Sequence, residues 1–146
     1  TAGKDIDALA RRALQEVGLD YAHGTGHGVG CYLCVHEKAT HISPKEENAF
    51  RTGMVVSNEP GYYKENAYGI RVENLVLVCA SDTPDHLCFE TLTRAPFDTS
   101  LIMRAMLDEN ENAWLSSYFK SVEQDLKPHL SDAEYVWLTK RLKDYI

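Results

Sequence analysis

"GMVVSNEPGYYKENAYGIRVENLVLVCA", residues 53–80, has the pattern of two β-strands joined by a polar turn. In the second strand the side chains alternate between two faces, one carrying Arg71, Glu73, Leu75 and Leu77 and the other Ile70, Val72, Asn74, Val76 and Val78. Pro60 and Gly61 break the first strand. We therefore predict an antiparallel hairpin here, with a fourth short strand at 88–93.

Two carboxylates stand on this hairpin, Glu59 on the first strand and Glu73 on the second. An antiparallel hairpin can place such residues side by side, where they repel each other and the pKa of one rises. A divalent cation between them removes the repulsion. Imidazole and carboxylate ligands suit Zn, Mn, Fe or Co, and an oxygen-rich set favours Mn. A single glutamate at a strand end is usually solvated, so this prediction depends on the pair.

The glycine-rich stretch "GTGHGVG", residues 24–30, surrounds His27 with residues that lack side chains. Glycine lets the backbone turn sharply or pass close to a phosphate, a neighbouring strand, or a metal and its substrate. A phosphate cradle is disfavoured, because the spacing fits neither a P-loop nor G-x-G-x-x-G and because a strand is expected next where a helix is required. His27 adds an imidazole to the two glutamates as a third candidate ligand, which favours a metal site over the other two explanations.

Alternating hydrophobicity after the glycines predicts a strand over 29–36, followed by a polar loop over 37–53. Cys31 and Cys34 have CxxC spacing, but no second cysteine pair accompanies them. We interpret both as ordinary half-buried residues. The predicted strands would aim five polar side chains inward, which is costly unless they pair or coordinate: His27, His36, Glu59, Arg71 and Glu73.

Helices are expected at both ends of the chain. Residues 5–17 are amphipathic, with Gly18 ending the helix and an apolar face made of Ile6, Leu9, Ala10, Ala13, Leu14 and Val17. From residue 98 glycine almost disappears, and two apolar stripes follow, Leu115–Tyr118–Phe119–Val122 and Tyr135–Leu138–Leu142. Ser131 and Glu134 form a capping box for the last helix.

The composition is that of a globular protein and excludes some partners. The 146 residues carry a net charge of −7, which disfavours nucleic acid. There is no apolar run long enough for a membrane span, so we expect no membrane partner. Four cysteines are too few for a disulfide scaffold, so we expect a cytoplasmic location.

Four motifs together resemble one family: "HGTGHGVG" (23–30), "VHE" (35–37), "GMVVSNEPGYY" (53–63) and "GIRVENLVLV" (69–78). They are similar to the second half of the pita-bread metallopeptidases, and most of all to the Xaa-Pro aminopeptidases (aminopeptidase P). The resemblance implies an α+β fold, the C-terminal half of the pita-bread (creatinase/aminopeptidase) fold with a curved antiparallel sheet. We expect it to occupy residues 1–93, with a helical C-terminal extension over 94–146.

The resemblance also implies roles for individual residues. His27, Glu59 and Glu73 match metal ligands, Glu73 being the one that bridges two ions, usually Mn(II). The positions that match catalytic or substrate-lining residues are His23, His36, Glu59 and Arg71. The implied substrate is a peptide with proline in second position, and the implied assembly is a homodimer.

One departure from the family pattern is that two aspartate ligands are expected well upstream of His27, whereas only 26 residues precede it. We therefore expect a fragment that lacks the N-terminal half of the catalytic domain, holds few or no metal ions and is inactive alone. Two alternatives to a fragment of an aminopeptidase P stay open. They are a prolidase-like dipeptidase of the same fold and a non-catalytic pita-bread binding protein.

Overall fold

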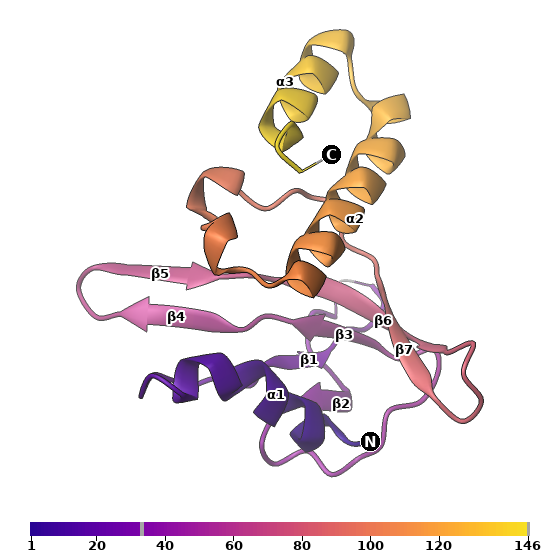
Figure 1. Cartoon of the computed structure of the whole chain (residues 1–146). Helices are drawn as coiled ribbons and strands as arrows, with labels where there is room; N and C mark the ends of the chain where they lie inside the picture. The colour runs from indigo at the N-terminus through magenta and orange to yellow at the C-terminus, as the bar shows by residue number, and fades with distance from the viewer. Residues whose placement is uncertain (33, 146) are drawn as a thin grey trace. The chain divides into compact units, whose positions relative to one another are not determined.

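The computed structural model of the chain describes residues 1–32 and 34–145. The chain divides into two compact units, Thr1–Thr93 and Arg94–Ile146, and Figure 1 traces both. The first unit contains one helix and the antiparallel strands. The second unit is helical.

The first unit is built on an antiparallel sheet with the strand order β2-β1-β3-β6-β7. A separate antiparallel ribbon, β4-β5, continues from it. The bounds are β1 Gly26–Gly28, β2 Glu37–Ile42, β3 Val55–Asn58, β4 Gly61–Lys64, β5 Tyr68–Arg71, β6 Asn74–Ala80 and β7 Leu87–Thr91.

The predicted hairpin is confirmed, and one register runs along its whole length. Asn58 pairs with Asn74 at the end of the β3–β6 ladder, and Gly61 pairs with Arg71 at the start of the β4–β5 ladder. Between the ladders the Val72 N–H donates to the Pro60 carbonyl at 3.2 Å. Pro60 has no N–H of its own, which explains why each long predicted strand is observed as two shorter ones.

The strand predicted over 29–36 is wrong, and the loop predicted over 37–53 is wrong for residues 37–42, which form β2. The first strand is instead made by the glycines, as β1, and the second by residues assigned to the loop, as β2. The connecting segment turns back at Tyr32, whose φ of 53° is left-handed. Its sequence alternates in hydrophobicity, but Tyr32 and Val35 are exposed, and Leu33 lies outside the described residues. Alternating hydrophobicity by itself does not produce a strand where no neighbouring strand pairs with the segment.

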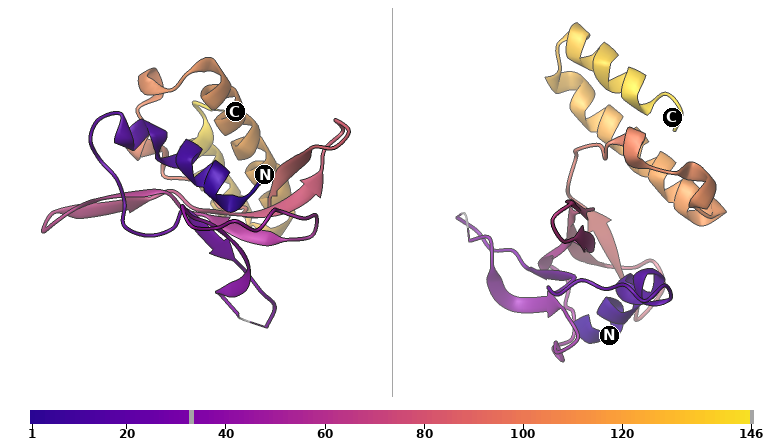
Figure 2. Two further views of the ribbon diagram at one scale, coloured as in Figure 1. Left: turned by 90° about the horizontal axis from the view of Figure 1, so that it is seen from below. Right: turned by 90° about the vertical axis from the view of Figure 1, so that its left-hand side faces the viewer.

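Helix α1, Gly3–Gln15, lies along one face of the sheet (Figures 1 and 2). Ile6 packs there against the core of the unit, which consists of Ile42, Phe50, Val56, Val76 and Val78. Gly18 has φ 75°, and the N–H groups of Gly18 and Leu19 donate to Gln15 and Leu14. These bonds form the Schellman motif expected at this glycine.

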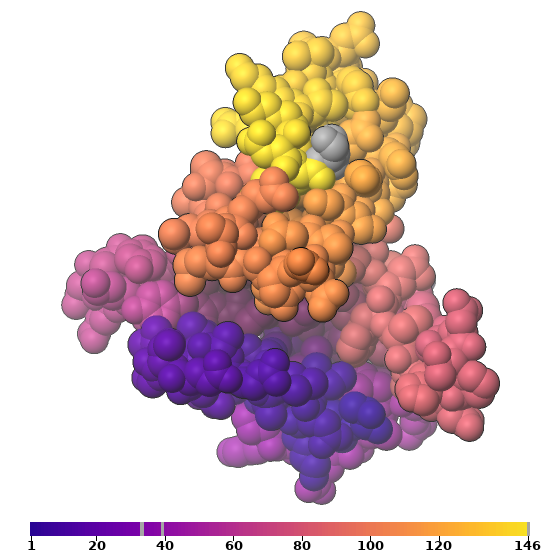
Figure 3. All heavy atoms as spheres, in the orientation of Figure 1, coloured from indigo at the N-terminus to yellow at the C-terminus, as the bar shows by residue number. Residues whose placement is uncertain are grey.

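The face that α1 buries is only partly the predicted one. Leu9 and Val17 are 63% and 69% exposed, whereas Asp7 and Arg11 are buried at 2% and 6% exposure. The space-filling view shows α1 at the surface of the first unit (Figure 3). Asp7 and Arg11 are hydrogen-bonded to each other and to the segment before β1, so the polar face can be buried.

The second unit has one core, which follows the predicted stripes. Helices α2, Glu109–Leu126, and α3, Asp132–Leu142, enclose Leu115, Tyr118, Phe119, Val122, Leu138, Leu142 and Tyr145. Both helices begin with a capping box, formed at α3 by Ser131 and Glu134 as predicted. Short 3₁₀ helices precede or join them at Thr99–Leu101, Arg104–Met106 and Lys127–His129. Among the described residues, no helix combines the length and apolar composition needed to cross a bilayer.

The core of the second unit provides a stability test with a matched control on one helix. Leu138→Ala removes a side chain that is 2% exposed, and we expect it to lower the free energy of unfolding of this unit by about 2–5 kcal/mol. Val136→Ala changes a side chain that is 64% exposed, and we expect a change within about 0.5 kcal/mol. Both tryptophans, Trp114 and Trp137, lie in this unit, so tryptophan fluorescence during urea unfolding follows it selectively. Equal losses for the two variants would contradict the assigned core.

Candidate active site

The glycine-rich stretch forms β1 because the neighbouring strands leave no room for side chains there. A Cβ atom on Gly26 would lie 1.8 Å from the carbonyl oxygen of Ser57, and one on Gly28 would lie 2.5 Å from that of Glu37. Glycine at these two positions lets β1 pass between β2 and β3. His27, between the two glycines, is thereby brought next to β3.

His27 faces Glu59 across the end of β3, with its Nε2 atom 3.2 Å from Glu59 Oε1. The other ring nitrogen, Nδ1, lies 2.9 Å from the carbonyl oxygen of Gly28. A carbonyl only accepts, so Nδ1 carries the proton, and in the neutral ring the lone pair of Nε2 points at a carboxylate. Two acceptors at this distance need a cation or a proton between them. Donation of the second ring N–H to a carbonyl is also usual for a metal-binding histidine.

Glu59 is almost fully buried and is held from three sides. Its Oε1 accepts from Ser57 Oγ at 2.8 Å, its Oε2 accepts from Arg71 Nη1 at 2.8 Å, and its backbone N–H donates to the Thr25 carbonyl at 2.7 Å. The Glu59 side chain is 10% exposed, against 44% for Arg71. A buried carboxylate requires such compensation, and these bonds leave it aimed at His27.

Ser57 is a site residue that the sequence analysis missed. Its side chain is completely buried, and Oγ accepts from the His27 N–H at 2.9 Å while donating to Glu59. Ser57 therefore connects the two side chains that face each other. The signal that could have found it is spacing, because residues two apart on a strand share a face.

Glu73 stands opposite Glu59 in the hairpin register, one position beyond the Asn58–Asn74 pair. The hydrogen bond that Arg71 donates to Tyr63 raises the pKa of Arg71. Partial desolvation lowers it, and the charges of Tyr63, Glu59 and Glu73 raise it further. Glu73 is thus close enough for its charge to act on the same guanidinium. Over residues 1–32 and 34–145, however, no three His, Cys, Asp or Glu side chains come together as a ready metal site.

His23 joins the site through Tyr63, a second residue missed at the sequence level. His23 Nδ1 donates to the Gly24 carbonyl at 2.7 Å, so its Nε2 accepts from the Tyr63 hydroxyl, also at 2.7 Å. Tyr63 in turn accepts from Arg71 Nε at 2.9 Å. A chain of hydrogen bonds thus runs from the buried carboxylate of Glu59 through Arg71 and Tyr63 to His23.

His36 reaches the site from the segment before β2, although that segment is not the predicted strand. Its ring lies against that of His27, with centroids 4.1 Å apart and the ring planes tilted by 41°. The structure therefore brings His23, His27, His36, Glu59 and Arg71 together and places Glu73 opposite Glu59. Cys31 and Cys34 are exposed free thiols, not half-buried as expected.

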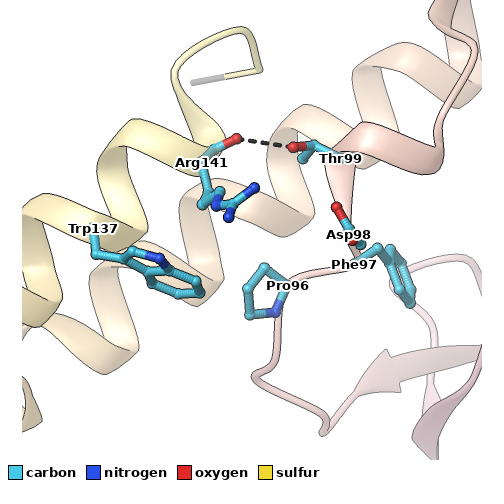
Figure 4. A pocket seen from close by; sticks show the side chains of 6 residues that line it. All are labelled: Pro96, Phe97, Asp98, Thr99, Trp137 and Arg141. Carbon is cyan, nitrogen blue, oxygen red and sulfur yellow. Dashed lines mark hydrogen bonds between the residues drawn. The ribbon is translucent and has the colours of Figure 1, made fainter.

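A separate pocket lies within the second unit (Figure 4). It is lined by Pro96, Phe97, Asp98, Thr99, Trp137 and Arg141. Thr99 Oγ1 donates to the Arg141 carbonyl at 3.1 Å, and the Arg141 guanidinium lies 5.6 Å from the centre of the Trp137 ring. None of the predicted site residues lines this pocket.

Two family profiles identify the class of protein as a metallopeptidase. The profile of metallopeptidase family M24 matches residues 1–80, and that of the C-terminal region of peptidase M24 matches residues 85–145. The chain belongs to metallopeptidase family M24.

The relatives with similar sequences include proteins named aminopeptidase P and Xaa-Pro aminopeptidase. The chain is 45% identical to aminopeptidase P1 of Lotus japonicus over 96% of its length and 40% identical to Xaa-Pro aminopeptidase 2 of Mus musculus over 94%. It spans 22% and 21% of those two proteins, about a fifth of each.

Solved structures agree with the fold prediction. The crystal structure of a cytosolic X-prolyl aminopeptidase from Caenorhabditis elegans, described as having a di-nuclear active site, matches with a TM-score of 0.88 and 35% identity. That match covers 97% of this chain and 24% of the other. An Xaa-Pro dipeptidase from Bacillus anthracis matches 66% of this chain and 25% of its own, with a TM-score of 0.54 and 32% identity. The predicted part of the pita-bread fold is confirmed.

The position of Ser57 generates a test of the site geometry. Ser57→Ala leaves the half-buried His27 N–H without its acceptor, and we expect the first unit to lose about 1–3 kcal/mol of unfolding free energy. Asn58→Ala, at the adjacent exposed position, should change it by no more than about 0.5 kcal/mol. Amide hydrogen exchange at His27 and in β3 measures both. Slow exchange at His27 in Ser57→Ala would show that Ser57 does not hold it.

Proposed function

We propose that this chain is part of an Xaa-Pro aminopeptidase, which hydrolyses the bond between an N-terminal residue and a following proline. The observation that carries the proposal is the Nε2 atom of His27 facing the buried Glu59 carboxylate at 3.2 Å, with Glu73 opposite in register. The similarity to proteins named aminopeptidase P, along nearly the whole chain, supports the substrate class.

The residues present fit part of a divalent metal centre. His27, Glu59 and Glu73 would be the ligands, with Glu73 shared between two ions. The lone pair of His27 Nε2 and the carboxylate oxygen of Glu59, 3.2 Å apart, are the donor types that Mn(II) accepts. The ions supply Lewis acidity toward water and the scissile carbonyl when bound. Three side chains are too few for two ions, so the other ligands come from residues outside this chain, and we expect the chain alone to be inactive.

The side chains of the chain itself have separate parts in the proposed reaction. Glu59 is the proton acceptor for the attacking water, because it is a carboxylate held beside the metal position. Arg71 balances the charge of Glu59 and orients it through the 2.8 Å hydrogen bond. His36 donates to the substrate carbonyl as negative charge develops there. Both ring nitrogens of His23 are engaged, so His23 acts on the substrate only after releasing Tyr63.

Two other functions are weaker. A prolidase-like dipeptidase would share the hairpin site, but the C-terminal region match over residues 85–145 and the 97% coverage by an X-prolyl aminopeptidase favour the longer enzyme. A non-catalytic binding protein would have no need of His27, Glu59 and Glu73 together. The proposed location is the cytoplasm, as for the neighbour described as cytosolic.

We also propose self-association, because β7 is an edge strand of the sheet and carries exposed apolar side chains. Leu87 and Phe89 are 45% and 42% exposed, and an unpaired edge recruits other strands. Light scattering of this chain at micromolar concentration should give a mass well above 16.5 kDa. Phe89→Lys should reduce that mass, and Val136→Lys on the second unit should not. A monodisperse 16.5 kDa species would contradict the prediction.

The proposed function is tested in the full-length protein that contains this chain. With Mn(II), it should release the N-terminal residue from peptides that have proline in second position. Glu73→Gln should cut turnover by at least about 100-fold and lower the metal content, because second-shell losses alone cost about 10–100-fold. Glu65→Gln, at the exposed tip of the same hairpin, should change neither, and His36→Ala should cut turnover with the metal retained. Near-normal turnover by Glu73→Gln would refute the ligand assignment, and cleavage of dipeptides alone would favour the prolidase.

A further inference from the structure

Helix α1 buries a charged pair, Asp7 and Arg11, and leaves Leu9 exposed. A buried ion pair adds little to stability compared with packed apolar side chains, so energetic gain alone does not explain this arrangement. An ion pair differs from an apolar pair in that it can hold particular backbone and side-chain atoms in place. The contacts of these two residues therefore indicate what they hold.

The Arg11 guanidinium binds the segment that leads into the site. Its Nε donates to Asp7 Oδ2 at 2.8 Å, and its Nη1 donates to Asp20 Oδ1 at 2.8 Å and to the Tyr21 carbonyl at 2.6 Å. Its Nη2 donates to the carbonyl of His23, also at 2.6 Å. Desolvation lowers the pKa of Arg11, but the hydrogen bonds to Asp7 and Asp20 raise it by more, so the group stays charged.

The second carboxylate oxygen of Asp7 also binds the segment of residues 21–25, through Thr25. Asp7 Oδ1 accepts from the Thr25 hydroxyl at 2.7 Å, which leaves the Tyr21 hydroxyl to donate to Thr25 Oγ1 at 2.5 Å. Thr25 is completely buried, and its carbonyl accepts the backbone N–H of Glu59 at 2.7 Å. A continuous path of hydrogen bonds thus runs from α1 to the backbone of the buried glutamate.

We propose that Asp7 and Arg11 are positioning residues, which fix residues 21–25 from the helix side and so set the placement of His23 and Glu59. Gly24 and Gly26 flank Thr25, and glycine backbones do not fix their own conformation. The rigid planar fork of a guanidinium binds two carbonyls and two carboxylates at set angles, which a lysine ammonium does not reproduce. The expected effect on catalysis rests on the proposed function, whereas the expected effect on geometry does not.

The geometric part is tested on this chain without metal or substrate. Arg11→Met should speed amide hydrogen exchange at Glu59 by at least about tenfold while exchange in α3 stays unchanged. Long-range proton–nitrogen NMR spectra should show His23 as a single Nδ1-protonated tautomer in the parent chain and as a mixture in Arg11→Met. Arg12→Met is the matched control, because Arg12 is exposed on the same helix, and both readouts should remain as in the parent.

A second pair of variants decides the question if Arg11→Met does not fold. Thr25→Val keeps the shape of the side chain but removes the hydroxyl between Asp7 and Tyr21, and it should mix the His23 tautomers. Thr25→Ser restores the hydroxyl and should restore the single tautomer. Unchanged His23 spectra and Glu59 exchange in the folded Thr25→Val variant would overturn the proposal.

The catalytic part is tested in the full-length protein. Arg11→Met or Thr25→Val should lower kcat by about tenfold or more with little change in KM, and Arg12→Met and Thr25→Ser should match the parent. If neither the parent nor any variant cleaves Xaa-Pro peptides but the NMR effects appear, the proposed function is wrong and the positioning role is supported. If the parent is active and every variant keeps its kcat, the positioning role fails and the proposed function stands.

Discussion

The close approach of β1 to β3 is the constraint on which the first unit depends. With only 1.8 Å between a would-be Cβ at Gly26 and the Ser57 carbonyl, no residue but glycine fits there. That approach lets the His27 N–H reach Ser57 Oγ and brings the His27 ring to Glu59. The glycines are thus a requirement of sheet packing, and the placement of the imidazole follows from it.

Charge compensation is the second theme of the site. The Glu59 carboxylate accepts from Ser57 and Arg71, yet one of its oxygens still faces Nε2 of His27. The protein has therefore stabilised the carboxylate without removing its capacity to bind a cation. A site built this way suits family M24, and the chain spans about a fifth of the relatives it matches.

Several elements followed directly from the sequence pattern because they depend on local rules. The hairpin at 53–80 combines period-two alternation with a proline–glycine break, and the helices at 109–126 and 132–142 combine apolar stripes with capping boxes. The strand expected over 29–36 failed for the opposite reason. A strand needs a neighbouring strand to pair with. The alternating pattern from Val29 to Val35 cannot show that β3 pairs instead with the preceding glycine-rich stretch, which forms β1.

The sequence by itself determined the family, the fold class and some of the residues that meet at the site, among them His27 and Glu59, since motif spacing reports which chemistry a chain can hold. Only the tertiary structure decided how those residues meet. Ser57 and Tyr63 became site residues because burial and hydrogen bonding between distant strands placed them there. The shift in the buried face of α1 had the same origin: periodicity identifies an apolar face, but the partners that bury Asp7 and Arg11 come from a segment folded back against the helix. Such partners are a property of packing in three dimensions, which no local pattern contains.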